Sequence, residues 1–480
     1  MTKLKHPQIL TGLAILSTMM PMKANAQTVA AEAIEGHVCG TDTLVWPHPI
    51  HSEHRMKQYG GFGYDGFASG IVDCYWSGGK KDQDFDKLNP GKWESLCKDI
   101  RESSPNVRKL PLNGYNFTTN QINDLIDALK ENKSVEYLDL KNTSFQKEDI
   151  SRLLDALKGN PNLKGLDLSG DAMTWKTVVH VGAFLQKNKS LETLFMGKAV
   201  WDPLTPIDKP EPEPIRVNGS FIQPITEVLY GNTTLKTLGF ANWGLSFDAL
   251  VELCRSLKYN KGLETLDLQN VKVGQSKPAN YLVLTDFYLS GDHPLKRLNV
   301  SGCEFGPGFG AAIAKALEKN THLEELYAIN NNFGPKDYRA IANMLFKNET
   351  LHEIHSNGDF DDESVILLAN SIGKNFTLTS ADFIDHGKMP SRAIQAINFA
   401  EGFNRKFQMA LRDPNATTLP YMNADIVDEY GSAMQKLVFD NFVPIKSYLK
   451  DNPDKKLSDY LEANFGVSRS PAVKQRGTSR

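Results

Sequence analysis

The sequence has little net charge, few cysteines and almost no long apolar runs. Its 480 residues carry 54 Lys and Arg against 57 Asp and Glu, a formal net charge of −3. This near balance argues against a nucleic-acid-binding protein and against a protein held to anionic membranes by a basic surface. Beyond the N-terminal segment no stretch is apolar for long enough to span a bilayer, which needs about 20 residues. We therefore expect no membrane insertion of the mature chain.

The N-terminus is the exception to the lack of apolar runs. Lys3 and Lys5 precede a short apolar run, and the small residues Ala24 and Ala26 follow in "MKANAQ". A basic start, a short apolar segment and an A-x-A end are typical of a cleaved secretory signal, here residues 1–26. A buried helix or a membrane anchor is the alternative, although the run is short for a span. We expect a secreted or periplasmic protein.

Only five cysteines are present, and an odd number leaves at least one unpaired. Cys39 and Cys74 lie in the same N-terminal region and are the candidate disulfide. The other three, Cys97, Cys254 and Cys303, fall at apolar positions of the repeats described below, so we expect them in the core.

Motifs for catalysis and cofactors are also lacking. The sequence contains no phosphate-binding loop, no zinc-protease helix and no G-x-S-x-G elbow. Histidines gather in "HPIHSEH" (48–54), but neighbouring prolines break any helix and no Cys or carboxylate spacing completes a zinc site. We expect no metal, no cofactor and no enzymatic activity.

What the chain has in abundance is a repeat. An Asn recurs mostly every 28 residues, and apolar residues follow it at plus three, plus six and plus eight, as in Val135, Leu138 and Leu140. Leu138 and Leu140 alternate with polar neighbours, which predicts a short strand with one buried face. The recurring Asn residues are Asn132, Asn160, Asn188, Asn232, Asn260, Asn320, Asn348 and Asn375.

The residues before each Asn follow a helical period. Apolar residues stand seven and three positions ahead of it, as Leu125 and Leu129 do before Asn132. A spacing of four predicts an amphipathic helix. We expect the Asn to end that helix, since Asn tolerates the left-handed conformation. Each unit is then one strand and one helix, which must stack on its neighbours to bury its apolar face.

The repeats resemble the leucine-rich repeat family. Leu138-x-Leu140, a helical return and the 28-residue period resemble its ribonuclease-inhibitor-like subclass. Cys303 and Asn331 stand at the family's Asn/Cys position, whereas Thr143, Asp171 and Val271 depart from it, so we expect an irregular set of turns. The resemblance implies an α/β solenoid, a right-handed curved horseshoe with a parallel sheet on its concave face. It also implies protein binding without catalysis.

The expected domains follow from this reading. About ten repeats occupy residues 93–389, with a Pro-rich insertion near 197–220. Residues 27–92 are rich in Gly and aromatics and are interpreted as an N-terminal cap or small domain. Residues 390–466 have a helical pattern typical of a C-terminal cap, and the basic tail 467–480 is expected to be disordered.

The partner-binding residues are expected between the leucines of each strand, where side chains point away from the core. Trp201, in the stiff insertion, either contacts the partner or packs on the solenoid. The candidates on the concave face are Tyr137, Asp139, Asp167, Phe195, Asp267, Arg297, Tyr327 and His355.

Two functions remain open at this point. The first is a secreted protein-binding scaffold, in a bacterium that presents it to host partners. The alternative is a periplasmic enzyme or carbohydrate-binding protein whose activity lies in the N-terminal region, with the repeats as scaffold. Binding tests of residues 93–390 and 27–92 separately would distinguish them.

Overall fold

A ten-stranded parallel sheet organises the chain. The computed structural model describes residues 90–143, 145–199, 218–271, 273, 281, 285, 294–384, 391–419 and 432–467. These residues belong to one unit, Pro49–Arg480. The predicted signal segment, the Cys39–Cys74 disulfide, Trp201 and the tail from residue 468 lie outside the described residues.

The strands lie at the recurring apolar residues, where the sequence predicted them. Each strand pairs in parallel with its neighbour, so that Leu110, Leu138, Leu166 and Leu194 lie side by side. The row ends at Ile354 and Ala381. The predicted strand positions are confirmed. The strands are β1 (Lys109–Pro111), β2 (Tyr137–Asp139), β3 (Gly165–Asp167), β5 (Thr193–Phe195), β7 (Thr237–Gly239), β8 (Thr265–Asp267), β9 (Arg297–Asn299), β10 (Glu325–Phe333), β11 (Glu353–Gly358) and β12 (Ser380–Ile384).

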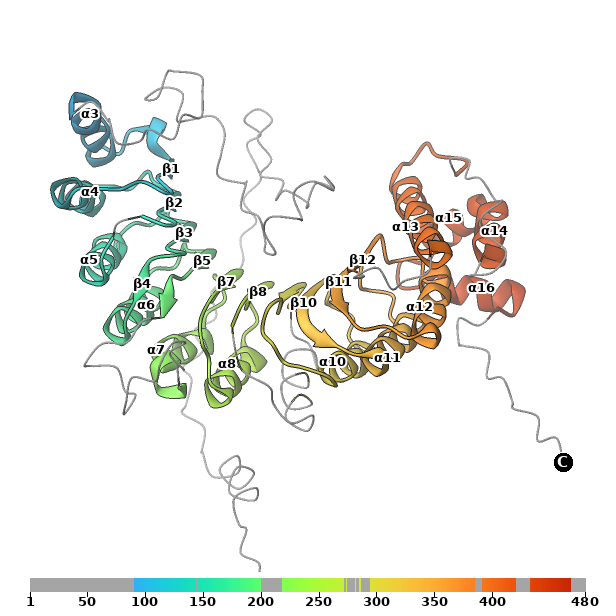
Figure 1. The fold of residues 1–480 in the computed structure, drawn as a ribbon. Coiled ribbons are helices and arrows are strands. Elements are labelled where there is room, and N and C mark those ends of the chain that lie inside the picture. The colour runs from blue at the N-terminus through green and yellow to red at the C-terminus, as the bar shows by residue number, and fades with distance from the viewer. Residues whose placement is uncertain are drawn as a thin grey trace, which may run out of the picture. The chain divides into compact units, whose positions relative to one another are not determined.

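A helix precedes or follows most strands, and the helices line one side of the sheet (Figure 1). In α4, Leu125 and Leu129 are fully buried, as the spacing predicted. Thr118 begins that helix, because its side chain accepts the Gln121 N–H in a capping box. The helices are α3 (Pro90–Arg101), α4 (Thr119–Glu131), α5 (Lys147–Leu157), α6 (Trp175–Lys187), α7 (Gly219–Leu229), α8 (Phe247–Tyr259), α10 (Phe309–Leu317), α11 (Pro335–Leu345) and α12 (Asp362–Lys374), with a 3₁₀ turn at Pro105–Val107.

The core between sheet and helices is continuous from Trp93 to Ala400. Cys97, Cys254 and Cys303 are buried in it, which confirms their expected core role. Burial raises the pKa of the Cys97 thiol to about 12, so that thiol stays protonated at neutral pH. These three cysteines are packing residues.

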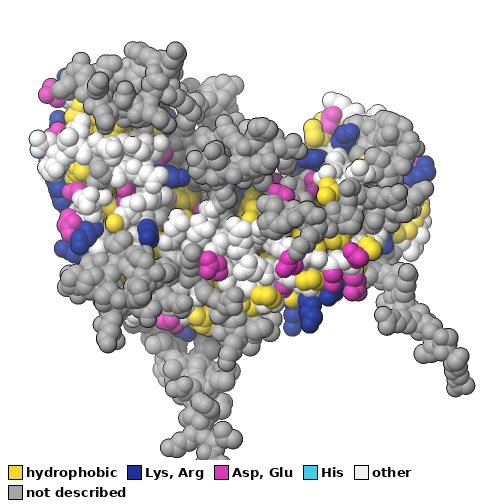
Figure 2. Space-filling view, in the orientation of Figure 1, with side chains coloured by type: hydrophobic (Ala, Val, Ile, Leu, Met, Phe, Trp, Pro, Cys, Tyr) yellow, Lys and Arg dark blue, Asp and Glu magenta, His cyan; other side chains and the backbone are white. Residues whose placement is uncertain are grey.

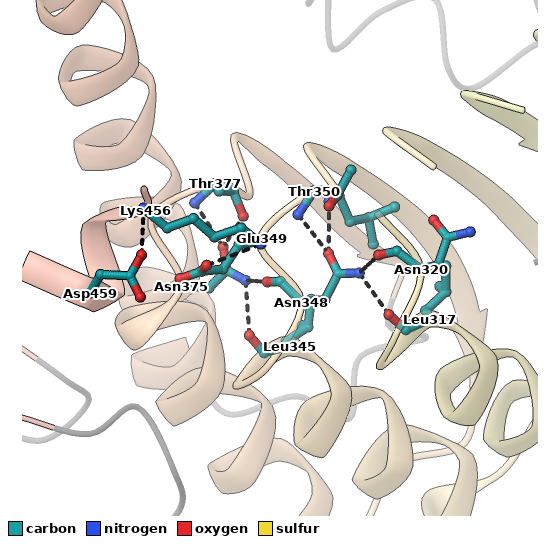
Figure 3. A network of polar contacts seen from close by, with 11 residues as sticks. Leu317, Asn320, Leu345, Asn348, Glu349, Thr350, Asn375, Thr377, Lys456 and Asp459 are labelled. Carbon is teal, nitrogen blue, oxygen red and sulfur yellow. Dashed lines mark hydrogen bonds and ion pairs between the residues drawn. The ribbon is translucent and has the colours of Figure 1, made fainter. Parts of the chain in front are cut away.

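The recurring Asn residues are here called the asparagine ladder. Asn132, Asn188, Asn260 and Asn375 end their helices as C-caps, but not for the expected reason, and the other four lie two residues after the C-cap. Asn132 has φ −72° and ψ 138°, an extended conformation rather than a left-handed one. In Figure 3 the Asn348 Nδ2 donates to the carbonyls of Leu317 (2.8 Å) and Asn320 (3.3 Å). Its Oδ1 accepts the N–H groups of Thr350 and Leu351. One buried amide thus ties the helix end of one repeat to the strand start of the next.

A second row of Asn and Gly residues takes the left-handed conformation, two residues after the last buried apolar residue of most strands. Asn142, Asn242 and Asn270 have φ of 53°, 66° and 55°. Gly170 and Gly302 occupy the equivalent position with φ of 89° and 71°. The tolerance that we assigned to the ladder therefore belongs to this row, where the chain turns away from the sheet.

The family's Asn/Cys position lies one residue later. Asn331 Nδ2 donates to the Val300 carbonyl at 2.8 Å, and Cys303 Sγ lies 3.1 Å from the Leu268 carbonyl. At the same position Trp243 donates its indole N–H to the Gly197 carbonyl. The set is irregular, as expected, because an indole and a thiol replace the amide.

The Pro-rich insertion is bordered by regular structure. β6 (Lys198–Ala199) pairs with β4 (Ala172–Met173) in a separate two-stranded sheet. Asn218 caps α7 by accepting the Phe221 N–H. The expected boundaries 197–220 therefore include the start of a helix, and residues 200–217 lie outside the description.

Among the described residues after the sheet, the helices are α13 (Ser391–Arg412), α14 (Ser432–Asp440), α15 (Phe442–Asp451) and α16 (Leu457–Phe465). Asn404 of α13 continues the asparagine ladder, since its amide donates to the carbonyls of Asn375 and Leu378, both at 2.7 Å. Lys456 before α16 lies 3.4 Å from Glu349 of the repeats (Figure 3). The helical pattern of residues 390–466 thus gives helices joined to the last repeat.

Candidate functional site

The side of the sheet opposite the helices carries all eight of the predicted sheet residues. Residues on either side of each central leucine share this side, because side chains alternate along a strand. We call it the sheet face. Tyr137, Arg297 and Tyr327 are half-buried there. Acidic and basic side chains are interspersed over the surface that Figure 2 shows, as the near balance of charge predicts.

Five of the predicted residues are buried, and the expectation that they are open to a partner is wrong. They are Asp139, Asp167, Phe195, Asp267 and His355, each at most 6% exposed. Parallel strands lie about 4.8 Å apart, so side chains in one row cover each other.

The three buried aspartates have an internal role. The Oδ1 atoms of Asp139, Asp167 and Asp267 each accept the N–H of the residue two positions later, at 2.8 to 3.0 Å. These bonds cap the strand ends where the backbone leaves the sheet. Burial raises the pKa of the Asp167 and Asp267 carboxyls to about 6.

The face of strands β3 to β8 carries small side chains beside the buried Asp167, Phe195 and Asp267. Thr193, Thr237 and Thr265 form a buried row. A Cβ on Gly239 would lie 2.4 Å from the Phe195 ring, so Phe195 covers that glycine. This part of the face offers few groups to a ligand.

The side chains on the face of β9 to β12 are larger and more often charged than those on β3 to β8. We call its residues Arg297, Glu325, Tyr327, Glu353, His355 and Asp382 the charged face. Arg297 Nε donates to Glu325 Oε1 at 2.8 Å. Tyr327 donates its hydroxyl to Glu353 Oε2 at 3.0 Å, and its ring stacks on His355 with centroids 4.7 Å apart.

His355 is the least usual residue of the charged face. It is 1% exposed, and neither ring nitrogen has a hydrogen-bond partner among the described residues. Nε2 lies 3.5 Å from Glu353 Oε2, close enough for an ion pair if the ring is protonated. A buried imidazole without hydrogen bonds is costly, so its environment merits a functional explanation.

Two further carboxyls lie near His355. Burial raises the pKa of the half-buried Asp382 carboxyl. Glu401 of α13 accepts the Ala381 N–H at 2.8 Å, and burial raises its pKa to about 7. Sequence reasoning missed Glu401. Its signal was the position of Asn404, three residues later, which extends the asparagine ladder by one repeat.

The side chains of the charged face can bind charged ligands and can take up or release protons. Among the described residues no three His, Cys, Asp or Glu side chains are grouped so as to hold a metal ion. No helix of the described part is both long and apolar enough to traverse a bilayer.

No family model matches the chain, and none of the curated proteins matches it. Among solved structures, it is similar to actin-binding site 2 of leiomodin-1, with 16% identity, 35% of this chain and 93% of that chain covered, and a TM-score of 0.29. A tropomodulin C-terminal domain from Caenorhabditis elegans has 12% identity, coverage of 35% and 96%, and a TM-score of 0.30.

A third similar structure is the leucine-rich repeat ectodomain of a plant membrane receptor kinase from Arabidopsis thaliana, solved with Casparian strip integrity factor 2. It has 13% identity, covers 59% of this chain and 39% of that chain, and has a TM-score of 0.34. Likenesses at these scores carry no argument about function. The α/β architecture, similar to that of leucine-rich repeats, rests on the ten strands in register and their buried leucine rows.

Proposed function

We propose that this protein is a non-catalytic, protein-binding repeat scaffold that uses the charged face of β9 to β12. The observation that supports the proposal is the contrast along the sheet face. Small or internally bonded side chains occupy β3 to β8, whereas β9 to β12 present half-buried Arg297, Tyr327, Glu353 and Asp382. Arg and Tyr are side chains that dominate protein interfaces, because they give large contact areas and directional hydrogen bonds.

The finer features belong to the same proposal. We infer that the stack curves into a right-handed horseshoe of the ribonuclease-inhibitor-like subclass, with the sheet face concave. The 28-residue period and the helical return support that subclass. The basic and apolar N-terminus supports cleavage after Ala26 and action outside the cytoplasm as a bacterial protein with host partners.

The test compares charge reversal on the two sides of the sheet. Asp382→Lys changes the charged face, whereas Glu131→Lys changes an exposed residue at the end of α4. We expect the first variant to lose a protein partner that the wild type captures from the extracellular milieu, and the second to keep it. Equal capture by all three proteins, with equal melting temperatures, would contradict the proposal.

A further inference from the structure

A row of lysines follows the asparagine ladder along the edge of the stack where the helices end. We call the positions from two before to one after each of the eight asparagines from Asn132 to Asn375 the ladder edge. Ten lysines occupy these positions, and the acidic residues there are Glu131, Glu318 and Glu349. The edge is therefore basic, although the whole chain has a net charge of −3.

The charges four residues after each ladder Asn are arranged differently. There Glu and Lys alternate between neighbouring repeats, as in Glu136 and Lys164 or in Glu264 and Lys296. Lys164 Nζ lies 3.6 Å from Glu136 Oε2, and Lys296 Nζ lies 3.0 Å from Glu264 Oε2. Opposite charges on adjacent repeats thus neutralise this row within the chain, whereas the ladder edge keeps an excess of positive charge.

Some lysines of the ladder edge pair within their own helix, as Lys130 does with Asp127. By contrast Lys133, Lys187 and Lys189 are exposed, and no ion pair joins them to another residue in the described part of the chain. A helix C-terminus attracts cations, which explains Lys187 at the end of α6. It does not explain Lys133 and Lys189, which follow the C-cap and lie outside the helix.

Two exposed tyrosines lie in the same row. Tyr230 is the C-cap of α7 and Tyr259 is the last residue of α8, and they are 57% and 49% exposed. Their ring centroids are 5.0 Å apart and their planes are inclined by 39°. Asn260 joins the two helix ends, because its Nδ2 donates to the carbonyls of Leu229 at 2.6 Å and of Asn232 at 2.8 Å. Two large aromatic rings thus face solvent on a backbone that the ladder fixes.

We propose that the ladder edge binds a linear anionic polysaccharide of the uronic-acid type along α4 to α8. This goes beyond the proposed function, because the residues involved are not those of the charged face. Adjacent helices lie about 8 to 10 Å apart, so the four steps from Lys133 to Lys261 extend over roughly 35 Å. A row of that length fits a polymer better than a small anion. The carboxylates bond the lysine ammonium groups, and the apolar faces of sugar rings pack on Tyr230 and Tyr259.

Other polyanions match the ladder edge less well. An acidic peptide provides carboxylates, but its side chains have no flat apolar face to cover two tyrosine rings. A nucleic-acid-binding protein is expected to be basic as a whole, whereas this chain is slightly acidic. In a 1,4-linked uronic acid chain every second ring places its carboxylate on the same side, at a spacing close to that of adjacent helices.

The test measures binding of an oligomannuronate to the full chain by isothermal titration calorimetry. Its neutral methyl ester and an oligoglutamate with the same number of carboxylates are the comparison ligands. We expect saturable binding of the oligomannuronate, about tenfold weaker binding of the oligoglutamate and no binding of the ester. Affinity should fall as the NaCl concentration rises, because each neutralised anionic group releases a counterion.

Matched variants on α6 then locate the site. Lys187→Glu reverses a charge on the ladder edge, whereas Lys176→Glu reverses an exposed charge in the first turn of the same helix. We expect the first variant to bind the oligomannuronate about tenfold more weakly and the second to bind it as the wild type does. A variant with Tyr230→Ser and Tyr259→Ser should keep its affinity for the oligoglutamate and lose the preference for the sugar.

Three results would overturn the inference. The first is equal affinity for the oligomannuronate and the oligoglutamate in the wild type. The second is an equal loss of affinity in both lysine variants. The third is tighter binding to oligothymidylate or to phosphatidylglycerol vesicles than to the oligomannuronate, which would make the edge a site for nucleic acid or for a membrane surface.

Discussion

Asparagines stand at two different positions of the repeat, and their backbone conformations separate the two roles. Asn132 and Asn188 are extended, and their amides are buried between two repeats. Asn142 and Asn270 are left-handed and lie where the chain leaves the strand. A buried amide that satisfies backbone groups on both sides is hard to replace, because every alternative leaves polar groups unbonded.

A substitution at Asn348 tests how much the buried asparagine ladder contributes to stability. Asn348→Ala removes the amide that bonds two carbonyls and two N–H groups. We expect the free energy of unfolding to fall by about 3 kcal/mol, because these buried groups lose their partners. Urea denaturation measures the change. Asn464→Ala, at an exposed site on α16, should cost less than about 0.5 kcal/mol. Similar losses in both variants would mean that the buried amide adds nothing to the turn.

Asp171 lies in the other turn of the repeat, where the chain leaves the strand, and it tests the cost of burying a carboxyl there. It accepts a hydrogen bond from the Thr143 hydroxyl at 3.2 Å, and burial raises its pKa to about 7. A carboxyl with a raised folded pKa contributes stability below its unfolded pKa near 3.8, and this contribution is lost as pH rises through 7.

We therefore expect Asp171→Asn to raise the free energy of unfolding at pH 8 by on the order of 2 kcal/mol, with little change at pH 4. Urea denaturation across this range measures it. Parallel pH curves for the variant and the wild type would rule out Asp171 as the source.

At the scale of elements, helices and strands could be predicted from the sequence because apolar residues recur with a different period in each. Leucines at a spacing of two and at a spacing of four alternate in every repeat, and the structure has strands and helices there. The apolar residues of α13 show the limit of this reasoning, since Ile394 is 40% exposed whereas Ile397, Phe403 and Phe407 are buried. Ile397 packs in the core of the repeats, whereas Phe403 and Phe407 pack in a second core with α14 and α15, and the period of α13 alone does not reveal this division.

The packing of α6 against α7 depends on one glycine. A Cβ on Gly182 would lie 2.4 Å from the Pro224 carbonyl oxygen, which is backbone and cannot move aside alone. We expect Gly182→Ala to lower the free energy of unfolding by about 2 kcal/mol through overpacking. Thermal or urea unfolding measures the loss. Gly159→Ala is the control, because nothing lies within 4 Å of its added Cβ. If both variants were equally stable, the helices would have room to separate.

At the scale of the molecule, the last strand needs a cap. Glu401 accepts the Ala381 N–H, and Asn404 donates to the Asn375 and Leu378 carbonyls. In a stack of repeats each unit is stabilised mainly by its neighbours. The helix α13 therefore stands in for a further repeat at this end.

Removal of that cap should loosen one end of the stack. In a chain that stops at residue 390, we expect fast amide hydrogen exchange in β12 and α12, with protection retained in β2 to β5. Mass spectrometry of the exchanged chain measures this gradient. A chain that stops at residue 419 keeps α13 and is the control. Uniform loss of protection along the stack would show that the repeats unfold as one unit.

The sequence by itself determined the repeat, the strand register and the buried leucine rows, because stacking leaves only one way to bury a period of 28 residues. It did not determine which sheet residues stay accessible. Tyr137 and Asp139 occupy equivalent positions in the pattern, yet one is half-buried and the other caps its own strand. The tertiary structure alone decided that, and it alone placed Glu401 and Asp382 near the buried His355. These contacts join residues from different repeats and from the C-terminal helix, whose separation along the chain carries no local signal.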